Sequence, residues 1–281
     1  MGCDAMKGVL QILSSWTNSM RYIARLGLRY SKILKDTSYL ELTQRYAGSA
    51  LGPAWIIIYP LVFLLIYLFL YMVVFRVRFP GLGTLNYVIY VFCGLVPYLI
   101  VMESVTRGLQ VIRENIHLIK NVIMPIELIP VRLVIVSFLA QGASMMMMIA
   151  LALFDGELSW RVIFLPDVLV LFAMLLTGAV YAISSLGVLF NDLTYIINLM
   201  MTALMFVSPI AFKPDMVPPG MEAVIYLNPV SYPLEAIRWS LLSNFEPNIF
   251  RLVAFPILAI SMFGWGSGFF RRFKGLMADN V

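Results

Sequence analysis

Long apolar stretches are the feature that most constrains this chain. Windows of about 20 residues with almost no charge recur along the sequence, and a helix of that length crosses the hydrocarbon core of a bilayer. Hydrophobic side chains make up 61% of the 281 residues and charged side chains only 12%, which excludes an ordinary soluble domain. The sequence therefore predicts an all-α integral membrane protein. Its six predicted transmembrane helices cover residues 55–75, 86–106, 128–153, 168–190, 193–212 and 250–270.

The basic residues indicate which side of the membrane each loop faces. If the N-terminus lies in the cytoplasm, 14 of the 20 lysines and arginines fall in cytoplasmic segments, as the positive-inside rule requires. This distribution accounts for the net charge of +5 without a nucleic-acid partner, because the basic residues form no base-reading module. We expect both termini in the cytoplasm, with residues 1–50 as a cytoplasmic N-terminal region, residues 51–271 as the six-span domain and residues 272–281 as a cytoplasmic tail.

The residues before the first window are predicted to form amphipathic helices on the inner membrane surface. Basic and apolar side chains recur on opposite sides of a helix between residues 21 and 33, which is typical of a helix lying in the interface. Ser38 and Glu41 then match the capping-box pattern, which predicts that a second helix begins at Ser38. Lipid anchoring and partner binding explain these helices equally well.

Six prolines interrupt the apolar segment 206–239, between the fifth and sixth windows. Proline removes a backbone donor, and an unsatisfied backbone group is costly in hydrocarbon, so this segment cannot be an ordinary span. The predicted topology places it on the outer side of the membrane. We interpret residues from about 213 to 248 as short re-entrant periplasmic helices at an exit; a plain external loop is the alternative.

Ionisable side chains within the windows bear on how the protein could be driven. Glu103 and Arg107 lie four residues apart near the cytoplasmic end of the second window, where they can pair on one helix face. We interpret them as a structural or gating ion pair rather than a proton relay, because of that end position.

Enzymatic chemistry finds little support in the sequence. The chain has no G-x-x-x-x-G-K-[ST] motif, so it cannot hold ATP phosphates with the usual loop. His117, the only histidine, has no cysteine or carboxylate cluster nearby that resembles a metal or nucleophile site. We therefore expect a transport subunit that holds no cofactor or metal, with any ATP hydrolysed elsewhere.

The loop between the second and third windows is too polar to cross the membrane and too apolar for a loop that is exposed only to solvent. Isoleucines recur there at helical spacing, so a short helix could present an apolar ridge to a protein groove. Packing against the chain's own helices is the alternative. The ridge residues are Ile112, Ile116, Ile119 and Ile123.

Several short motifs together resemble one family of membrane proteins. The run RYAGSALGPAWIIIYPL, which begins at Arg45, is similar to the entry of the first span in permease subunits of ABC-2 type polysaccharide exporters, the O-antigen, capsule and teichoic-acid group. NVIMPIELIP, the pair Asn191 and Asp192, SPI at 208–210 and NP at 228–229 follow in the family's order. The resemblance covers nearly the whole chain from Arg21 onward. One departure is Asn191, where many relatives have arginine, which puts a charge contact at that cytoplasmic turn in doubt.

The resemblance implies both an assembly and a function. It implies a homodimer of six-span subunits in the cytoplasmic (inner) membrane, bound to two ATP-binding cassette subunits that hold ATP and Mg. It also implies that residues 112–123 form a coupling helix toward the ATPase, together with the turn at Asn191 and Asp192. The expected substrate is a lipid-linked polysaccharide moved outward. Alternatives are an ABC-2 permease for a smaller amphiphile such as a drug or lipid, and a membrane-embedded glycan- or lipid-modifying enzyme, for which the sequence offers no catalytic group.

Aromatic residues occupy every fourth position of the first window, from 55 to 75. Each four-residue step advances about 40° around a helix, so these rings cannot all face one pore. We select Tyr59, Phe63 and Tyr67 as a candidate glycan path, because aromatic faces pack on the C–H faces of sugars. Plain packing and interfacial anchoring are the alternatives.

The fifth window carries a polar stripe that includes Asn198 and Thr202. Polar side chains gain nothing toward lipid, so we expect this stripe to face water or protein and to border the same path. A hydrogen-bonded seam between helices is the alternative.

Overall fold

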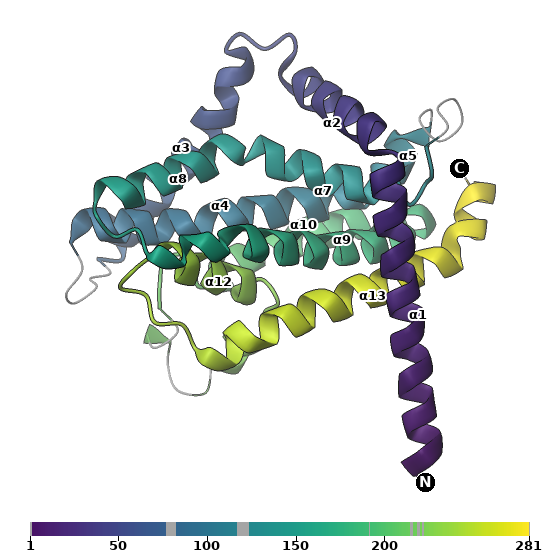
Figure 1. Cartoon of the computed structure of the whole chain (residues 1–281). Helices are drawn as coiled ribbons and strands as arrows, with labels where there is room; N and C mark the ends of the chain where they lie inside the picture. The colour runs from purple at the N-terminus through teal and green to yellow at the C-terminus, as the bar shows by residue number, and fades with distance from the viewer. Residues whose placement is uncertain are drawn as a thin grey trace.

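The computed structural model describes residues 2–76, 83–116, 124–190, 192–213, 216–217, 220 and 222–280. Every element named in these ranges is a helix, which confirms the predicted all-α class (Figure 1). The longer helices are α1 (Gly2–Arg29), α2 (Ser31–Tyr46), α3 (Trp55–Leu68), α4 (Thr84–Gly108), α7 (Leu128–Ala140), α8 (Gly142–Phe154), α9 (Leu165–Leu189), α10 (Leu193–Val207), α12 (Ser231–Leu241) and α13 (Ile249–Asn280). The shorter ones are η1 (Gly52–Ala54), the π-helical η2 (Phe69–Val74), α5 (Val111–Glu114), η3 (Trp160–Phe164) and α11 (Glu222–Leu227).

Four helical segments in the described ranges are long and apolar enough to cross a membrane: Gly52–Val74, Thr84–Gly108, Trp160–Leu189 and Ile249–Gly275. The pair α7 and α8 bends by 44° and supplies a fifth if it is counted as one span. α10 has only 15 residues, which is fewer than the about 20 that a span needs. The chain is therefore a multi-pass membrane protein, and the six predicted windows are confirmed in part.

α10 ends earlier than its window because of a proline. Ser208 caps it with an extended backbone (φ −72°, ψ 143°), as expected for a residue that precedes proline. The chain then runs without helix through Pro209 to Phe212. The predicted fifth window thus divides into a short helix and a non-helical continuation.

α4 is the central helix of the bundle. In its most apolar stretch 83% of the residues are buried, against 22% in the span that contains α3. α3, α7, α8, α9, α10 and α12 all contact α4. α3 therefore lies at the periphery and presents most of its apolar surface outward.

α9 and α13 form the most extensive helix pair of the structure. Glycine allows their backbones to meet: a Cβ added to Gly266 would lie 2.0 Å from the carbonyl oxygen of Gly178. A Cβ on Gly178 would in turn lie 2.4 Å from the carbonyl oxygen of Met262. Close backbone approach through small residues is the usual basis of helix association in membranes.

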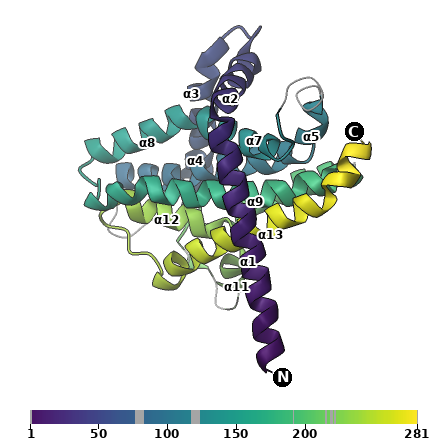
Figure 2. The same ribbon diagram turned by 45° about the vertical axis from the view of Figure 1, so that its right-hand side comes forward.

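The N-terminal helices differ from the prediction at their boundaries. α1 runs to Arg29 and α2 begins at Ser31, so the break falls at Tyr30 and the predicted start at Ser38 is wrong. Ser38 lies buried in the middle of α2, where it caps nothing. α1 crosses the other helices at a steep angle (Figure 1, Figure 2), as a helix in the membrane surface would, and its Trp16 packs against Gly264 of α13.

α12 lies inside the bundle although it belongs to the proline-rich segment. It contacts α4, α9 and α13, and nine of its 11 residues are buried, including Glu235 and Arg238. A plain external loop would leave such residues in water, so this part of the segment is embedded in protein.

Candidate functional site

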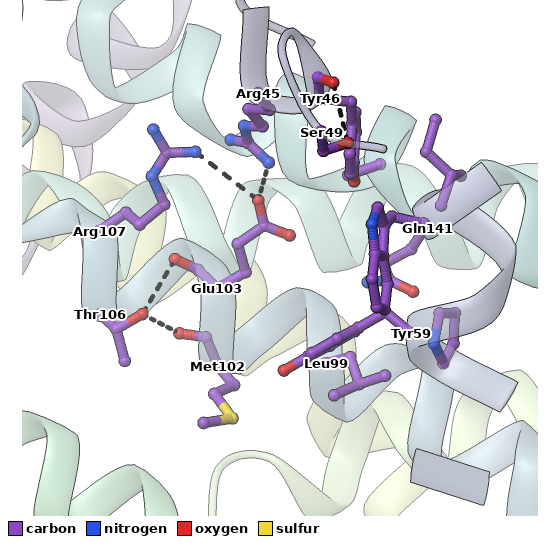
Figure 3. Close-up of a pocket in the computed structure, with 14 residues that line it drawn as sticks. Arg45, Tyr46, Ser49, Tyr59, Leu99, Met102, Glu103, Thr106, Arg107 and Gln141 are labelled. Carbon is purple, nitrogen blue, oxygen red and sulfur yellow. Dashed lines mark hydrogen bonds and ion pairs between the residues drawn. The ribbon is translucent and has the colours of Figure 1, made fainter. Parts of the chain in front are cut away.

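A cavity of about 490 Å³ lies between α2, α3, α4 and the junction of α7 with α8 (Figure 3). The C-terminal half of α4 forms one wall, and the turn from α2 into α3 forms another. The polar side chains that line it are those of Arg45, Ser49, Glu103, Thr106, Arg107 and Gln141, and the aromatic ones are those of Tyr46, Trp55 and Tyr59.

Two arginines meet Glu103 at the cavity wall. The predicted pair is present, with the Nη1 of Arg107 3.9 Å from the Oε1 of Glu103. Arg45 of α2 is the closer partner, since its Nη1 donates a hydrogen bond to the same oxygen. No local pattern indicated that Arg45 reaches Glu103, because the two residues are 58 positions apart along the chain. The gating role of the pair stays a prediction.

Glu41 of α2 extends this network away from the cavity. Its Oε1 lies 3.2 Å from the Nη2 of Arg45 and 3.1 Å from the Nη2 of Arg107. Its Oε2 accepts a hydrogen bond of 2.6 Å from the Nη2 of Arg132 on α7. Arg132 also donates through Nη1 to the Oδ1 of Asn115, at 2.7 Å. One set of ion pairs thus connects α2, α4, α7 and the end of α5.

The cavity is lined mostly by apolar surface, and its charged side chains, those of Arg45, Arg107 and Glu103, carry a cationic surplus. The network joins three arginines to two carboxylates, and the side chain of Arg107 remains 36% exposed. Gln141 also borders the cavity, but its Oε1 is buried and has no hydrogen-bond partner among the described residues. Burial, followed by the charge of Glu103, raises the pKa of Tyr46 above its ordinary value, which keeps this phenol neutral. The site can therefore hold an anionic group beside hydroxyl-rich or apolar surface.

The residues predicted for a glycan path are not gathered in this cavity. Tyr59 lines it, and the ring of Phe63 lies 5.0 Å from that of Tyr59. Tyr67 is buried and its hydroxyl donates a hydrogen bond of 2.9 Å to the carbonyl oxygen of Met205. Tyr67 therefore fastens α3 to α10 inside the subunit.

Asn198 and Thr202 lie together on an exposed face of α10. Both side chains are exposed, and the hydroxyl of Thr202 donates to the carbonyl oxygen of Asn198 at 2.9 Å. The neighbouring exposed side chains on this helix are large and apolar, among them Tyr195 and Leu199. The polar stripe thus stands in an apolar surface of the isolated chain.

Arg238 of α12 organises the other end of α4. It is fully buried, and its guanidinium donates to the carbonyl oxygens of Pro209 and Ile210, both at 2.6 Å, and to that of Tyr90 at 3.3 Å. It also stacks over the ring of Tyr90, 3.8 Å from the centroid. Sequence reasoning counted this arginine only as an external charge, although its place inside an apolar segment was a signal of a buried role.

Comparison with known proteins identifies the family. The family model described as ABC-2 type transporter matches residues 38–242. The chain belongs to the ABC-2 type transporter family. The match runs from the middle of α2 to the end of α12 and confirms the resemblance drawn from the motifs. Membership also identifies this ABC-2 chain as a transport protein rather than an enzyme.

Three curated relatives are similar to the ABC-2 chain over most of its length, and each is called an O-antigen export system permease protein RfbA. One, from Myxococcus xanthus, is 23% identical over 90% of this chain and 96% of its own. Two from Klebsiella pneumoniae are each 28% identical, one over 68% of this chain and 73% of its own length, the other over 76% and 81%.

The residues predicted to contact an ATPase are only partly visible in the ABC-2 chain. Ile112 is fully buried and belongs to the subunit's own core, whereas Ile116 is partly exposed. Ile119, Ile123 and Asn191 lie outside the described residues. Asp192 is exposed directly before α10. Among the described ridge residues, Ile116 alone offers surface to a partner.

Proposed function

We propose that this chain is the membrane-spanning permease subunit of an ATP-driven exporter of lipid-linked polysaccharide of the O-antigen type. Its ABC-2 membership and the names of its three relatives support this function. The chain lacks a phosphate-binding loop motif, so ATP and Mg would be bound by two separate ATPase subunits. Two copies of the chain would form the transmembrane part in the cytoplasmic (inner) membrane, with both termini in the cytoplasm.

The cavity between α2, α3 and α4 is the observation that carries the proposal for this chain. A lipid-linked polysaccharide combines an anionic linkage, sugar hydroxyls and an apolar tail. The cavity offers Arg107 for the anion, Ser49 for a hydroxyl and Tyr59 for a sugar face. Because it lies beside the peripheral α3, an amphiphile could reach it from the lipid.

The outward faces of α3 and α10 support a homodimer with a central conduit. Leu65 on α3, Phe69 on η2 and Leu199 on α10 are more than half exposed in the single chain. Asn198 and Thr202 interrupt this surface with polar groups that lipid would not favour. We assign this face to the second copy and to a watery path between the copies. In this arrangement α10 and residues 208–212 form the fifth of six spans, and α11 and α12 form the re-entrant exit segment.

The opposite surface would meet the ATPase subunits. Ile116, which is partly exposed, and Asp192, which is exposed, are the described residues that support this docking, since a helix-in-groove contact is made by apolar anchors. Ile116→Asp should leave the permease in the membrane but lower copurification of the ATPase. Glu114→Gln, an exposed change on α5, is the matched control.

Deletion of the gene is the test of the proposed function. The surface polysaccharide should disappear, its lipid-linked form should accumulate inside, and the wild-type chain should restore export and copurify with an ATP-binding cassette protein. Tyr59→Ala should restore less export than Tyr39→Ala, since Tyr39 is exposed on α2 away from the cavity. An unchanged surface polysaccharide would reject this substrate and favour a smaller amphiphile. Copurification with no ATPase would reject the transporter assembly.

A further inference from the structure

Glu41 stands outside the cavity but touches both arginines in its wall. We propose that Glu41 is a positioning residue that couples the cavity to α5, so that α2 shifts over the cavity in step with the segment assigned to ATPase docking. This inference rests on the proposed function. It concerns a residue that binds neither substrate nor nucleotide.

The two carboxylate oxygens of Glu41 serve different neighbours. Oε1 lies between Arg45 and Arg107 at the cavity wall, whereas Oε2 binds Arg132 on α7. Glu41 is therefore the one group in the described network with contacts on both sides. A movement that brings the Glu41 carboxylate closer to Arg132 therefore draws it away from Arg45 and Arg107, and the reverse movement does the opposite.

The path continues from Arg132 to α5 through directed hydrogen bonds. Arg132 binds Glu41 with one terminal nitrogen and the Oδ1 of Asn115 with the other. The Nδ2 of Asn115 donates in turn to the carbonyl oxygen of Val111, the first residue of α5, at 2.8 Å. Charge-assisted bonds with a planar guanidinium fix orientation as well as distance, so a displacement of α5 is transmitted to Glu41.

Burial makes the two ends of this path unequal. The side chain of Arg132 is 7% exposed, against 36% for Arg107. Ion pairs are weaker where they are exposed to water. The Glu41–Arg132 ion pair is therefore the stronger of the two, and the Glu41–Arg107 ion pair breaks first. An anion in the cavity would compete with Glu41 for Arg107 and so weaken one of the contacts between α2 and α4, while the Glu41–Arg132 contact keeps α2 tied to α7. By linkage, a movement of α5 must change the cavity in return.

The test measures how accessible the cavity is to water in two nucleotide states of the ATPase. The full chain and its ATPase are reconstituted in lipid nanodiscs with Cys3→Ser, Cys93→Ala and a reporter Ser49→Cys in the cavity wall. The rate of labelling by a water-soluble thiol reagent is measured without nucleotide and after trapping with ATP and vanadate. We expect trapping to change this rate by about fivefold or more, the lower end of ordinary allosteric coupling.

Removal of the Glu41 charge should abolish that response. In Glu41→Gln the two labelling rates should converge, whereas Asp36→Asn, an exposed carboxylate change on the same helix, should keep both the wild-type ratio and the wild-type ATP hydrolysis. A purely structural role would lower the yield of Glu41→Gln and leave its ratio intact. A retained ratio in Glu41→Gln, or equal rates in the wild-type complex, overturns the proposal.

A second measurement needs no ATPase and separates this inference from the proposed function. Spin labels at Tyr39→Cys on α2 and Glu114→Cys on α5, both exposed positions, report the distance between these helices in the chain alone. Glu41→Gln should shift or broaden that distance distribution, and Glu41→Asp should do so less. An unchanged distribution in Glu41→Gln rejects the positioning role, even if no ATPase is ever found.

Discussion

Along α4, two arginine sites show opposite ways of holding a guanidinium in an apolar protein. Near its C-terminal end Arg45 and Arg107 face carboxylates and border a cavity. Near its start Arg238 donates hydrogen bonds to carbonyl oxygens, stacks on the ring of Tyr90 and has no exposed surface. Tyr90 and Glu103, the α4 residues at the two sites, are separated by about 20 Å of helix.

The difference lies in what happens when a contact is lost. A carboxylate at the cavity has other arginines within reach and water nearby, so the network can rearrange at small cost. The carbonyl groups around Arg238 have no such substitute and would be left buried and unsatisfied. The charged site is therefore suited to movement and the carbonyl site to fixing the end of α10.

Loss of Arg238 should have the largest effect of the changes we consider. Arg238→Met leaves the carbonyl oxygens of Pro209 and Ile210 without their donor, which should cost about 3–5 kcal/mol in stability. Arg161→Met is the control, since Arg161 also binds carbonyl oxygens, those of Leu242 and Ser243, but is partly exposed. Its cost should be about 1 kcal/mol. Thermal unfolding in detergent checks both, and equal midpoints for the two variants would contradict the comparison.

The room for Arg238 depends on a glycine. A Cβ on Gly94 would lie 2.3 Å from the Nη2 of Arg238 and 3.1 Å from the backbone of Ile210, so Gly94→Ala should destabilise by about 1–3 kcal/mol through overpacking. Gly27→Ala in α1, where a Cβ meets nothing within 4 Å, should instead gain about 0.5–1 kcal/mol from helix propensity. A Gly94→Ala protein that unfolds at the wild-type temperature would show that the residues around Gly94 can rearrange to accept the added methyl group.

The features that could be predicted from the sequence are those that depend on the spacing of residues within one segment. The apolar windows led to the membrane class and the helical fold, and the four-residue separation of Glu103 and Arg107 led to a pair that the structure contains. The fifth window was predicted to continue through Pro209 to Phe212, whereas α10 ends at Val207; the proline was the local signal for that end. Each of these features is a property of one continuous segment.

Contacts between segments that are far apart in the sequence could not be predicted from such patterns. Glu41 matched a capping box, but the structure gives it arginines from α4 and α7. Tyr67 belonged to an aromatic series whose spacing could not reveal which rings face inward, and it binds α10. Arg238 depends on the meeting of α4, α10 and α12. Tertiary contacts decided these roles, and the local patterns were compatible with several.

Neutralising Glu103 should have a moderate effect at the cavity. Glu103→Gln removes one carboxylate, but Arg45 and Arg107 keep Glu41 as a partner, so the cost should be at most about 1 kcal/mol. Export into inverted vesicles should still require ATP and should not respond to collapse of the proton gradient, because a gating pair carries no proton. Transport driven by a proton gradient without nucleotide would reject this role and the ABC mechanism with it.

Salt should produce the smallest effect and distinguish the two sites most directly. Raising the salt concentration from about 0.1 M to about 1 M shortens the Debye length from about 10 Å to about 3 Å. Partly exposed pairs such as Glu41–Arg107 should weaken, so the Ser49→Cys reporter should label about twofold faster, in line with about 0.5 kcal/mol for such pairs. The native Cys93 is fully buried next to Gly94 and reports the Arg238 site in a Cys3→Ser background. Because neither Cys93 nor Arg238 has exposed surface, Cys93 should stay unreactive at both concentrations. If high salt increased the labelling rate of Cys93 as much as that of the cavity reporter, the contacts at the two ends of α4 would be equally sensitive to screening. The proposed difference between a fixed Arg238 site and a movable cavity site would then be wrong.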